Sequence, residues 1–270
     1  MRLLFLTLAA LLIATGCGGS QQPMSRDQEP LADRDPYAFH RSIGVTLLQT
    51  DQPRRALPHL QRLERMRPES PEPYYLVART YMALELDRPA ETYLKRSLVL
   101  NENYAPAHAM LGVLLDGQGH HVRAGNAHKR AIELAPRHPG YHNNMGFNLY
   151  LRGHYDQAVE AYNRALGLEP SSRRIHNNIG FAYAELGELD RAWDHFSRGG
   201  SPAEAKNNLG MAYETRGELE AAFELYAEAL RTDPDLEQAR GNLERVAVSL
   251  ERDLPDKAEP GHTTQGMISR

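Results

Sequence analysis

Hydrophobic and polar positions follow a helical period along most of the chain, and the pattern repeats between about residues 37 and 234. Each unit carries a small residue in its first half, with large apolar residues one position before and three after it. These large residues are four apart and therefore share one face of a helix. The small markers are Gly44, Ala78, Gly112, Gly146, Gly180 and Gly210. The pattern predicts a series of helix pairs, at first 34 residues apart and at the last step 30.

Further positions keep the same register. An alanine follows each marker by twelve residues, and a large residue follows it by sixteen, except in the third unit, where that place holds His128. Each of the last four markers is followed seven residues later by a glycine, at the place where a left-handed residue should end the first helix. Prolines that forbid further helix stand at the ends of four units. Helix pairs of this kind bury their apolar faces only against neighbouring pairs, which predicts a solenoid.

The unit length of 34, the G-x-x-[LY] pattern, the following alanine and the closing proline resemble the tetratricopeptide repeat (TPR) family. The resemblance implies an all-α fold: a right-handed TPR superhelix, or α-solenoid, of about six helix-turn-helix repeats plus a C-terminal capping helix. The predicted units are 37–70, 71–104, 105–138, 139–172, 173–202 and 203–236, and the predicted capping helix is 235–252. The fifth unit is four residues short at 198–202, which predicts a local change of superhelical pitch.

The first sixteen residues differ from the rest. A positive start at Met1-Arg2 precedes the apolar stretch 3–13, which is too short for a permanent membrane span and is typical of a signal peptide. Small residues then lead to Cys17, and this arrangement resembles the lipobox of bacterial lipoproteins. The resemblance implies that residues 1–16 are removed and that Cys17 carries covalent lipid, with no other cofactor. The alternative is an ordinary secretory signal followed by an unrelated cysteine.

The lipoprotein resemblance also implies a location. Gly18, and not Asp, follows the acceptor cysteine, which in Gram-negative lipoproteins favours the periplasmic face of the outer membrane in the cell envelope. Residues 17–34 are polar and contain Gly and Pro, so we expect a flexible tether between lipid and repeats. Residues 253–270 have the same character and are predicted to form a disordered tail.

Composition restricts the classes of partner. The net charge is −4, so the chain lacks the excess of basic residues that is typical of nucleic-acid-binding proteins. A single cysteine excludes an internal disulfide framework. The TPR resemblance implies that the partner is a protein, either an extended peptide or a helix of an envelope-complex component, and the lipoprotein resemblance implies membrane contact only through the lipid.

Paired asparagines stand just before the markers of units four to six, and an apolar residue follows each of these markers. Asparagine side chains both donate and accept hydrogen bonds, so a row of them could pair with the backbone of a peptide. The alternative is that these asparagines join neighbouring repeats. The predicted peptide-binding groove consists of Asn143, Asn144, Phe147, Asn177, Asn178, Phe181, Asn207, Asn208, Met211 and Asn242.

Histidines recur four residues before a marker, at positions 40, 108, 142 and 176, and three more stand in unit three. Their spacing follows the repeat and not the geometry of metal ligands, so we expect packing and no metal site. The chain contains no G-x-S-x-G, H-E-x-x-H, P-loop or dinucleotide-binding motif, and we do not expect an enzyme.

A TPR lipoprotein of this size resembles the Tad/Flp pilus-assembly lipoproteins and the type IV pilus pilotins. That resemblance implies a scaffold that assists assembly of a pilus or secretin complex at the outer membrane. A second hypothesis is an adaptor that recruits periplasmic proteases or peptidoglycan hydrolases. A third, from another class, is an envelope hydrolase.

Overall fold

The computed structural model describes residues 35–252 and 254, and within them the chain forms thirteen helices and no strands. None of these helices is both long enough and apolar enough to cross a membrane. The predicted signal peptide, Cys17, the tether 17–34 and the tail 253–270 lie outside the described residues, apart from Leu254. The helices are α2 (Pro36–Gln49), α3 (Pro53–Met66), α4 (Pro71–Ala83), α5 (Asp87–Leu100), α6 (Ala105–Gly117), α7 (His121–Leu134), α8 (Pro139–Leu151), α9 (Tyr155–Leu168), α10 (Arg173–Glu185), α11 (Leu189–Gly199), α12 (Pro202–Thr215), α13 (Leu219–Thr232) and α14 (Glu237–Ser249).

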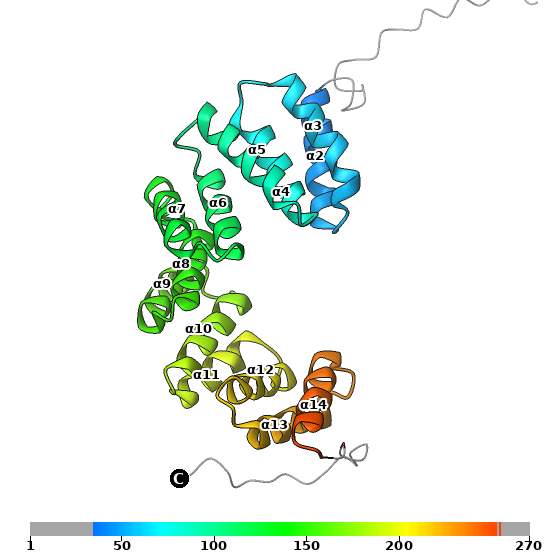
Figure 1. The fold of residues 1–270 in the computed structure, drawn as a ribbon, viewed down its shortest axis with the longest axis vertical. Helices are drawn as coiled ribbons and strands as arrows, with labels where there is room; N and C mark the ends of the chain where they lie inside the picture. The colour runs from blue at the N-terminus through cyan, green and yellow to red at the C-terminus, as the bar shows by residue number, and fades with distance from the viewer. Residues whose placement is uncertain (1–34, 253, 255–270) are drawn as a thin grey trace, which may run out of the picture.

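The helices stack as consecutive pairs. Each even-numbered helix from α2 to α12 packs against the helix that follows it, and also touches the even-numbered helix of the next pair. The stack curves, with α6, α8 and α10 toward the inside of the arc and α7, α9 and α11 on the outside (Figure 1). The first helices of successive pairs therefore line one continuous inner face.

The small markers allow the two helices of a pair to approach closely. A Cβ built on Gly146 would lie 2.6 Å from Cδ1 of Tyr162, and one on Gly180 would lie 2.6 Å from Cδ1 of Phe196. Real Cβ atoms do not come so near an aromatic ring, so the large residue sixteen positions later fills the space that glycine leaves. The pattern of small marker and distant large residue is thus one steric unit.

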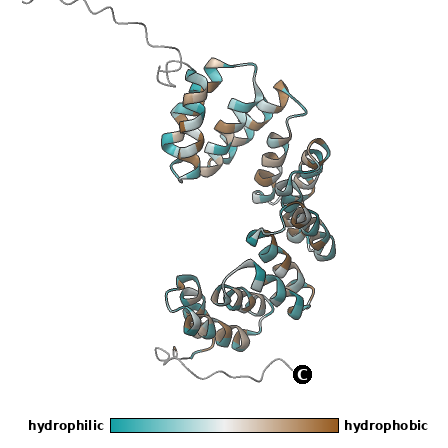
Figure 2. Cartoon of the chain, turned by 180° about the vertical axis from the view of Figure 1, so that it is seen from behind, coloured by the Kyte–Doolittle hydropathy of each residue, from teal (hydrophilic) through white to brown (hydrophobic). Residues whose placement is uncertain are grey.

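The core is shared between neighbouring pairs. The six alanines that follow the markers by twelve residues are fully buried, as are Tyr162 of α9 and Ile175 and Ile179 of α10, which pack in one cluster. Figure 2 shows hydrophobic and hydrophilic residues mixed along each helix, as expected where only part of its surface is covered. No pair buries its apolar face alone, which is the physical basis of a solenoid.

The predicted left-handed residues end the first helices. Gly119, Gly153, Gly187 and Gly217 have φ between 73° and 80°. In the first two pairs the same place is taken by Asp51 (φ 53°) and Glu85 (φ 59°), where the Cβ atom makes a left-handed conformation unfavourable.

The fifth pair is short. Helix α11 has 11 residues, whereas α9 and α13 have 14 each. The turn that follows is held by Arg173 Nε and Asn177 Nδ2, which donate to the carbonyl of Gly199 at 3.1 and 3.2 Å. Ser201 then begins α12 with a capping box, in which its hydroxyl accepts from the amide of Glu204 and the Glu204 carboxylate accepts in return.

Candidate functional site

An apolar stripe follows the inner face of the central helices. It consists of the residues directly after four markers: Val113 of α6, Phe147 of α8, Phe181 of α10 and Met211 of α12. Val113, Phe147 and Met211 remain 40%, 46% and 38% exposed, respectively. Phe181 is partly covered and packs edge-on against the buried Phe196, with ring centroids 4.9 Å apart. Large side chains exposed in register on adjacent helices indicate a surface for binding.

The first asparagines of the fourth and sixth units lie deeper than an open groove requires. Asn143 and Asn207 are only 5% and 2% exposed. Asn178 Nδ2 donates to Oδ1 of Asn143 at 2.8 Å, and Asn242 Nδ2 donates to Oδ1 of Asn207 at 2.9 Å. Each bond joins the first helices of consecutive pairs. These asparagines thus join neighbouring repeats, which is the alternative interpretation given in the sequence analysis.

The remaining asparagines have different surroundings. Asn177 is held at the Gly199 turn, and its Oδ1 is buried without a partner. Asn208 accepts a long bond of 3.4 Å from Asn207. Asn144 is partly exposed and makes no side-chain hydrogen bond to another described residue. Asn144 and Asn208 are therefore the members of the predicted row that remain most available to a partner.

An arginine stands at each end of the stripe, in the same register. At one end Arg79 of α4 lies over the Tyr75 ring, 5.9 Å from its centroid. At the other end Arg245 of α14 donates to both carboxylate oxygens of Glu214, at 3.0 and 2.8 Å. The charge of Arg245 is thus neutralised by Glu214, whereas Arg79 forms no ion pair among the described salt bridges.

A buried carboxylate joins three helices in the middle of the stack. Asp116 of α6 accepts from His128 Nε2 of α7 and His121 Nδ1, both at 3.0 Å, and from Asn148 Nδ2 of α8 at 2.7 Å. Burial by itself would raise the Asp116 pKa, but the hydrogen bonds from His128, His121 and Asn148 outweigh it and lower the pKa below its usual value. The carboxylate is therefore charged at neutral pH.

The same arrangement recurs in the sixth pair. Glu214 stands four residues after its marker, as Asp116 does, and accepts from the hydroxyl of Tyr226 at 2.7 Å. Tyr226 stands sixteen after the marker, as His128 does, and Arg245 supplies the contact from the next pair. Sequence reasoning missed both junctions. The available signal was an acidic residue four after the marker together with a polar side chain sixteen after it.

The histidines four before the markers serve the turns and the pair contacts. His108 and His142 each donate from Nε2 to a backbone carbonyl six residues earlier, at 2.7 Å. Nδ1 of His40 lies 2.9 Å from Nδ1 of His59, and Nδ1 of His176 lies 3.1 Å from Nδ1 of His195. Among the described residues no group of three or more His, Cys, Asp or Glu side chains could hold a metal ion.

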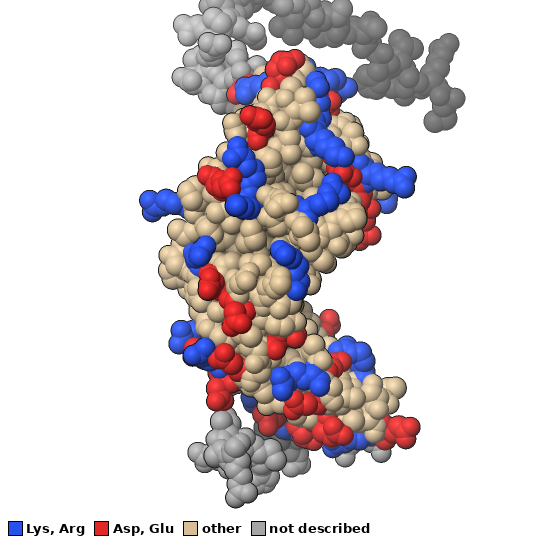
Figure 3. Space-filling model, turned by 60° about the vertical axis from the view of Figure 1, so that its left-hand side comes forward, with Lys and Arg blue, Asp and Glu red and all other residues tan. Residues whose placement is uncertain are grey.

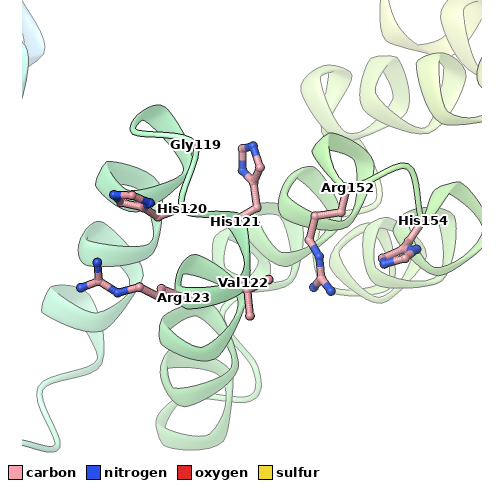
Figure 4. A pocket seen from close by; sticks show the side chains of 7 residues that line it. All are labelled: Gly119, His120, His121, Val122, Arg123, Arg152 and His154. Atoms are coloured by element: carbon pink, nitrogen blue, oxygen red, sulfur yellow. The ribbon is translucent and has the colours of Figure 1, made fainter.

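One shallow depression lies at the edge of the stack, between the turns of the third and fourth pairs. It measures about 430 Å³ and is open to solvent. Figure 4 shows that its polar side chains spread in different directions and do not converge on one point. It therefore has no built binding site. Its lining residues are Gly119, His120, His121, Val122, Arg123, Arg152 and His154.

Charges on the outer side are mixed. Figure 3 shows acidic and basic side chains interspersed there, with uncharged surface between them. No patch of a single sign covers this view, which agrees with the small net charge of the chain. The outer side in this view thus lacks the basic stripe that nucleic-acid binding requires.

Two segments match family models of the tetratricopeptide repeat. Residues 148–187 match a model described as TPR repeat, and residues 203–236 match one described as Tetratricopeptide repeat. No curated protein matches the chain in sequence.

Solved structures share the fold at low identity. PilW, a type IV pilus biogenesis factor, has a TM-score of 0.65 and 16% identity over 77% of this chain and 99% of its own. PilF of Pseudomonas aeruginosa has a TM-score of 0.61 and 16% identity over 82% and 99%. The Cut9–Hcn1 hetero-tetramer of APC/C has a TM-score of 0.66 and 18% identity over 80% of this chain, which spans 44% of that chain. Together with the helices, these likenesses confirm the predicted all-α TPR solenoid.

Proposed function

Starting from a TPR solenoid with an accessible inner face, we propose that this chain is a scaffold of the cell envelope that holds a protein partner against α6, α8, α10 and α12. The observation that carries the proposal is the apolar stripe of Val113, Phe147, Phe181 and Met211. Side chains of this kind would be buried if they served only the core. TPR domains are in general non-catalytic scaffolds, which supports a binding role over an enzymatic one.

We further propose that the partner belongs to a pilus or secretin complex. The fold likeness to PilW and PilF supports this choice, together with the resemblance of the sequence to pilus-assembly TPR lipoproteins. The competing role is the adaptor for periplasmic proteases or peptidoglycan hydrolases.

The proposed anchor is lipid on Cys17, at the periplasmic face of the outer membrane. A chain with Cys17→Ser should leave the membrane fraction for the soluble periplasmic fraction, and mass spectrometry of the wild-type N-terminus should find an acylated cysteine. A wild-type chain with an unmodified N-terminus would contradict the anchor and leave the binding role untouched.

The binding role is tested by crosslinking the acylated protein in native membranes and comparing the captured partners of two variants. Phe147→Asp places a charge in the stripe and should abolish capture, because burial of an unpaired carboxylate is costly. Val122→Asp changes a valine that is 68% exposed at the edge of the stack and should capture as wild type does. Secretin or pilus components in the wild-type capture support the proposal. Capture of hydrolases or proteases favours the adaptor, and equal capture by both variants rejects the inner face.

A further inference from the structure

We infer that the partner on the inner face is an amphipathic α-helix of about 25 residues, with an acidic residue at the end that lies over α4. The inference rests on the proposed function and names the kind of partner that the surface fits. Three observations carry it: the length of the apolar stripe, the engagement of the asparagines, and the difference between the two arginines at its ends.

The stripe has the length of a medium helix. Its four residues stand on four successive first helices, each in contact with the next. Axes of packed helices lie about 8–10 Å apart, so three such steps span about 24–30 Å. A helix rises 1.5 Å per residue, so about 16–20 residues cover the stripe, and the further step of about 8–10 Å to α4 brings the total to about 21–27 residues. The apolar face of an amphipathic helix, with side chains at i, i+3, i+4 and i+7, provides a row of contacts along such a stripe.

The asparagine bonds disfavour an extended peptide. An extended chain brings one N–H and one C=O per residue that need partners when water is excluded, whereas a helix satisfies these groups internally. The amides of Asn178 and Asn242 are donated to Asn143 and Asn207, and the amide of Asn177 is donated to Gly199. The asparagine amides that could hydrogen-bond to an extended backbone are thus largely bonded within the solenoid already. The apolar side chains beside them remain exposed.

The charges at the two ends differ. Arg245 donates to both carboxylate oxygens of Glu214, so its charge is balanced within the chain. Arg79 lies over the ring of Tyr75 and has no carboxylate partner in the described salt bridges. A partner helix therefore gains an ion pair if it presents an acidic side chain over α4, and gains none at the α14 end.

The test uses the full chain in detergent and four labelled synthetic peptides of about 25 residues, whose binding is measured by fluorescence anisotropy. The first peptide has a leucine stripe at helical spacing and two glutamates at one end. The second has two lysines in place of the glutamates. The third has the composition of the first in permuted order without a stripe, and the fourth is the first with two central prolines that prevent a helix. The glutamate and lysine peptides are each made in two versions, one with the charged residues at the N-terminus and one with them at the C-terminus.

The helical acidic peptide should bind at least about tenfold more tightly than the permuted and proline peptides. Phe147→Asp and Met211→Asp should each weaken it by about tenfold or more, while Val122→Asp and the paired Asn144→Ala, Asn208→Ala change should leave it within about threefold. Arg79→Glu should reverse the order of the glutamate and lysine peptides. Circular dichroism spectra that match wild type show that the variants are folded.

The outcomes distinguish failure of the inferred helical partner from failure of the proposed binding function. If the proline peptide binds as well as the helical one, and binding is lost on Asn144→Ala, Asn208→Ala and on Phe147→Asp, the groove stands and the helical partner is rejected. If Arg79→Glu leaves the preference between glutamate and lysine unchanged, the acidic end is rejected. If no peptide responds to Phe147→Asp and capture from membranes also persists in that variant, the proposed function falls with the inference.

Discussion

The imidazole of His128 donates a hydrogen bond of 3.0 Å to the carboxylate of Asp116, and both side chains are buried where α6, α7 and α8 meet. The first two pairs have Leu60 and Leu94 in the place of His128, so a leucine fits the space. His128→Leu nevertheless removes one of the three side-chain donors to the buried carboxylate, which keeps its bonds from His121 and Asn148. We expect the free energy of unfolding in urea to fall by about 1–3 kcal/mol.

A double variant tests whether the two residues act together. Asp116→Met with His128→Leu recreates the second pair, which has Met82 and Leu94 in these places. The double variant should be more stable than the sum of the single changes predicts, by about 0.5–3 kcal/mol, because the carboxylate and its buried imidazole donor are removed together, while Asn148 Nδ2 keeps its bond to the carbonyl of His121. Strictly additive losses would show that the bond contributes nothing specific.

The repeat itself could be predicted from the sequence because its signals are local and steric. Gly146 recurs with Tyr162 at a fixed spacing, and Gly119 marks a left-handed turn by its residue type alone. The hydrogen-bond partners of the asparagines could not be predicted in this way. Whether Asn178 faces a peptide or Asn143 depends on the rotation of two helices from different pairs, which a one-dimensional pattern does not specify.

The polar junctions were missed for a related reason. Asp116 and Glu214 have the composition of ordinary helix-surface acids, and their donors come from two other helices. His128 is an exception at an apolar position, but the sequence does not show that its partner lies twelve residues earlier on the preceding helix. A polar residue at a core position is therefore a reason to search the same register of the preceding helix for an acid.

The close contact at a marker glycine gives a second prediction. Gly146→Ala would place a methyl group against the buried Tyr162 ring, and neither helix can move without disturbing its neighbours. We expect a loss of about 1–3 kcal/mol in unfolding free energy. Gly167→Ala is the matched control, since nothing lies within 4 Å of a Cβ at that position of α9. The control should be neutral or more stable by up to about 1 kcal/mol, and equal losses in both variants would contradict the steric explanation.

The left-handed residue of the second pair gives a third prediction. Glu85 has a φ of 59° at the place where four other pairs have glycine. Glu85→Gly removes the unfavourable Cβ contact and should raise the unfolding free energy by about 0.5–1 kcal/mol after the greater entropy of the unfolded glycine is subtracted. Glu85→Ala retains a Cβ in the same conformation and should bring no gain. A rise in melting temperature with alanine as large as with glycine would point to the carboxylate and not to the backbone.

The histidine pair of the fifth unit predicts a dependence of stability on pH. Nδ1 of His176 lies 3.1 Å from Nδ1 of His195, so one ring donates and the other accepts, and a proton added to both would break the bond. Burial, followed by the nearby His176, lowers the pKa of His195 below its usual 6.5. Asp194 acts in the opposite direction, and Arg198 reinforces the decrease.

The sign follows from proton uptake. Below about pH 6.5 the unfolded chain binds protons that the folded pair resists, so the unfolding free energy should decrease as the pH falls from 7.5 toward 5.5. The His40–His59 pair has the same geometry, and the pKa of His40 is lowered in the same direction, by burial and then by His59. Replacing His195 by Gln keeps a hydrogen-bonding side chain without titration and should remove part of this slope; the combined change with His40→Gln should remove more. Urea unfolding at five pH values measures the slope, and an unchanged slope in the double variant would show that the histidine pairs do not cause it.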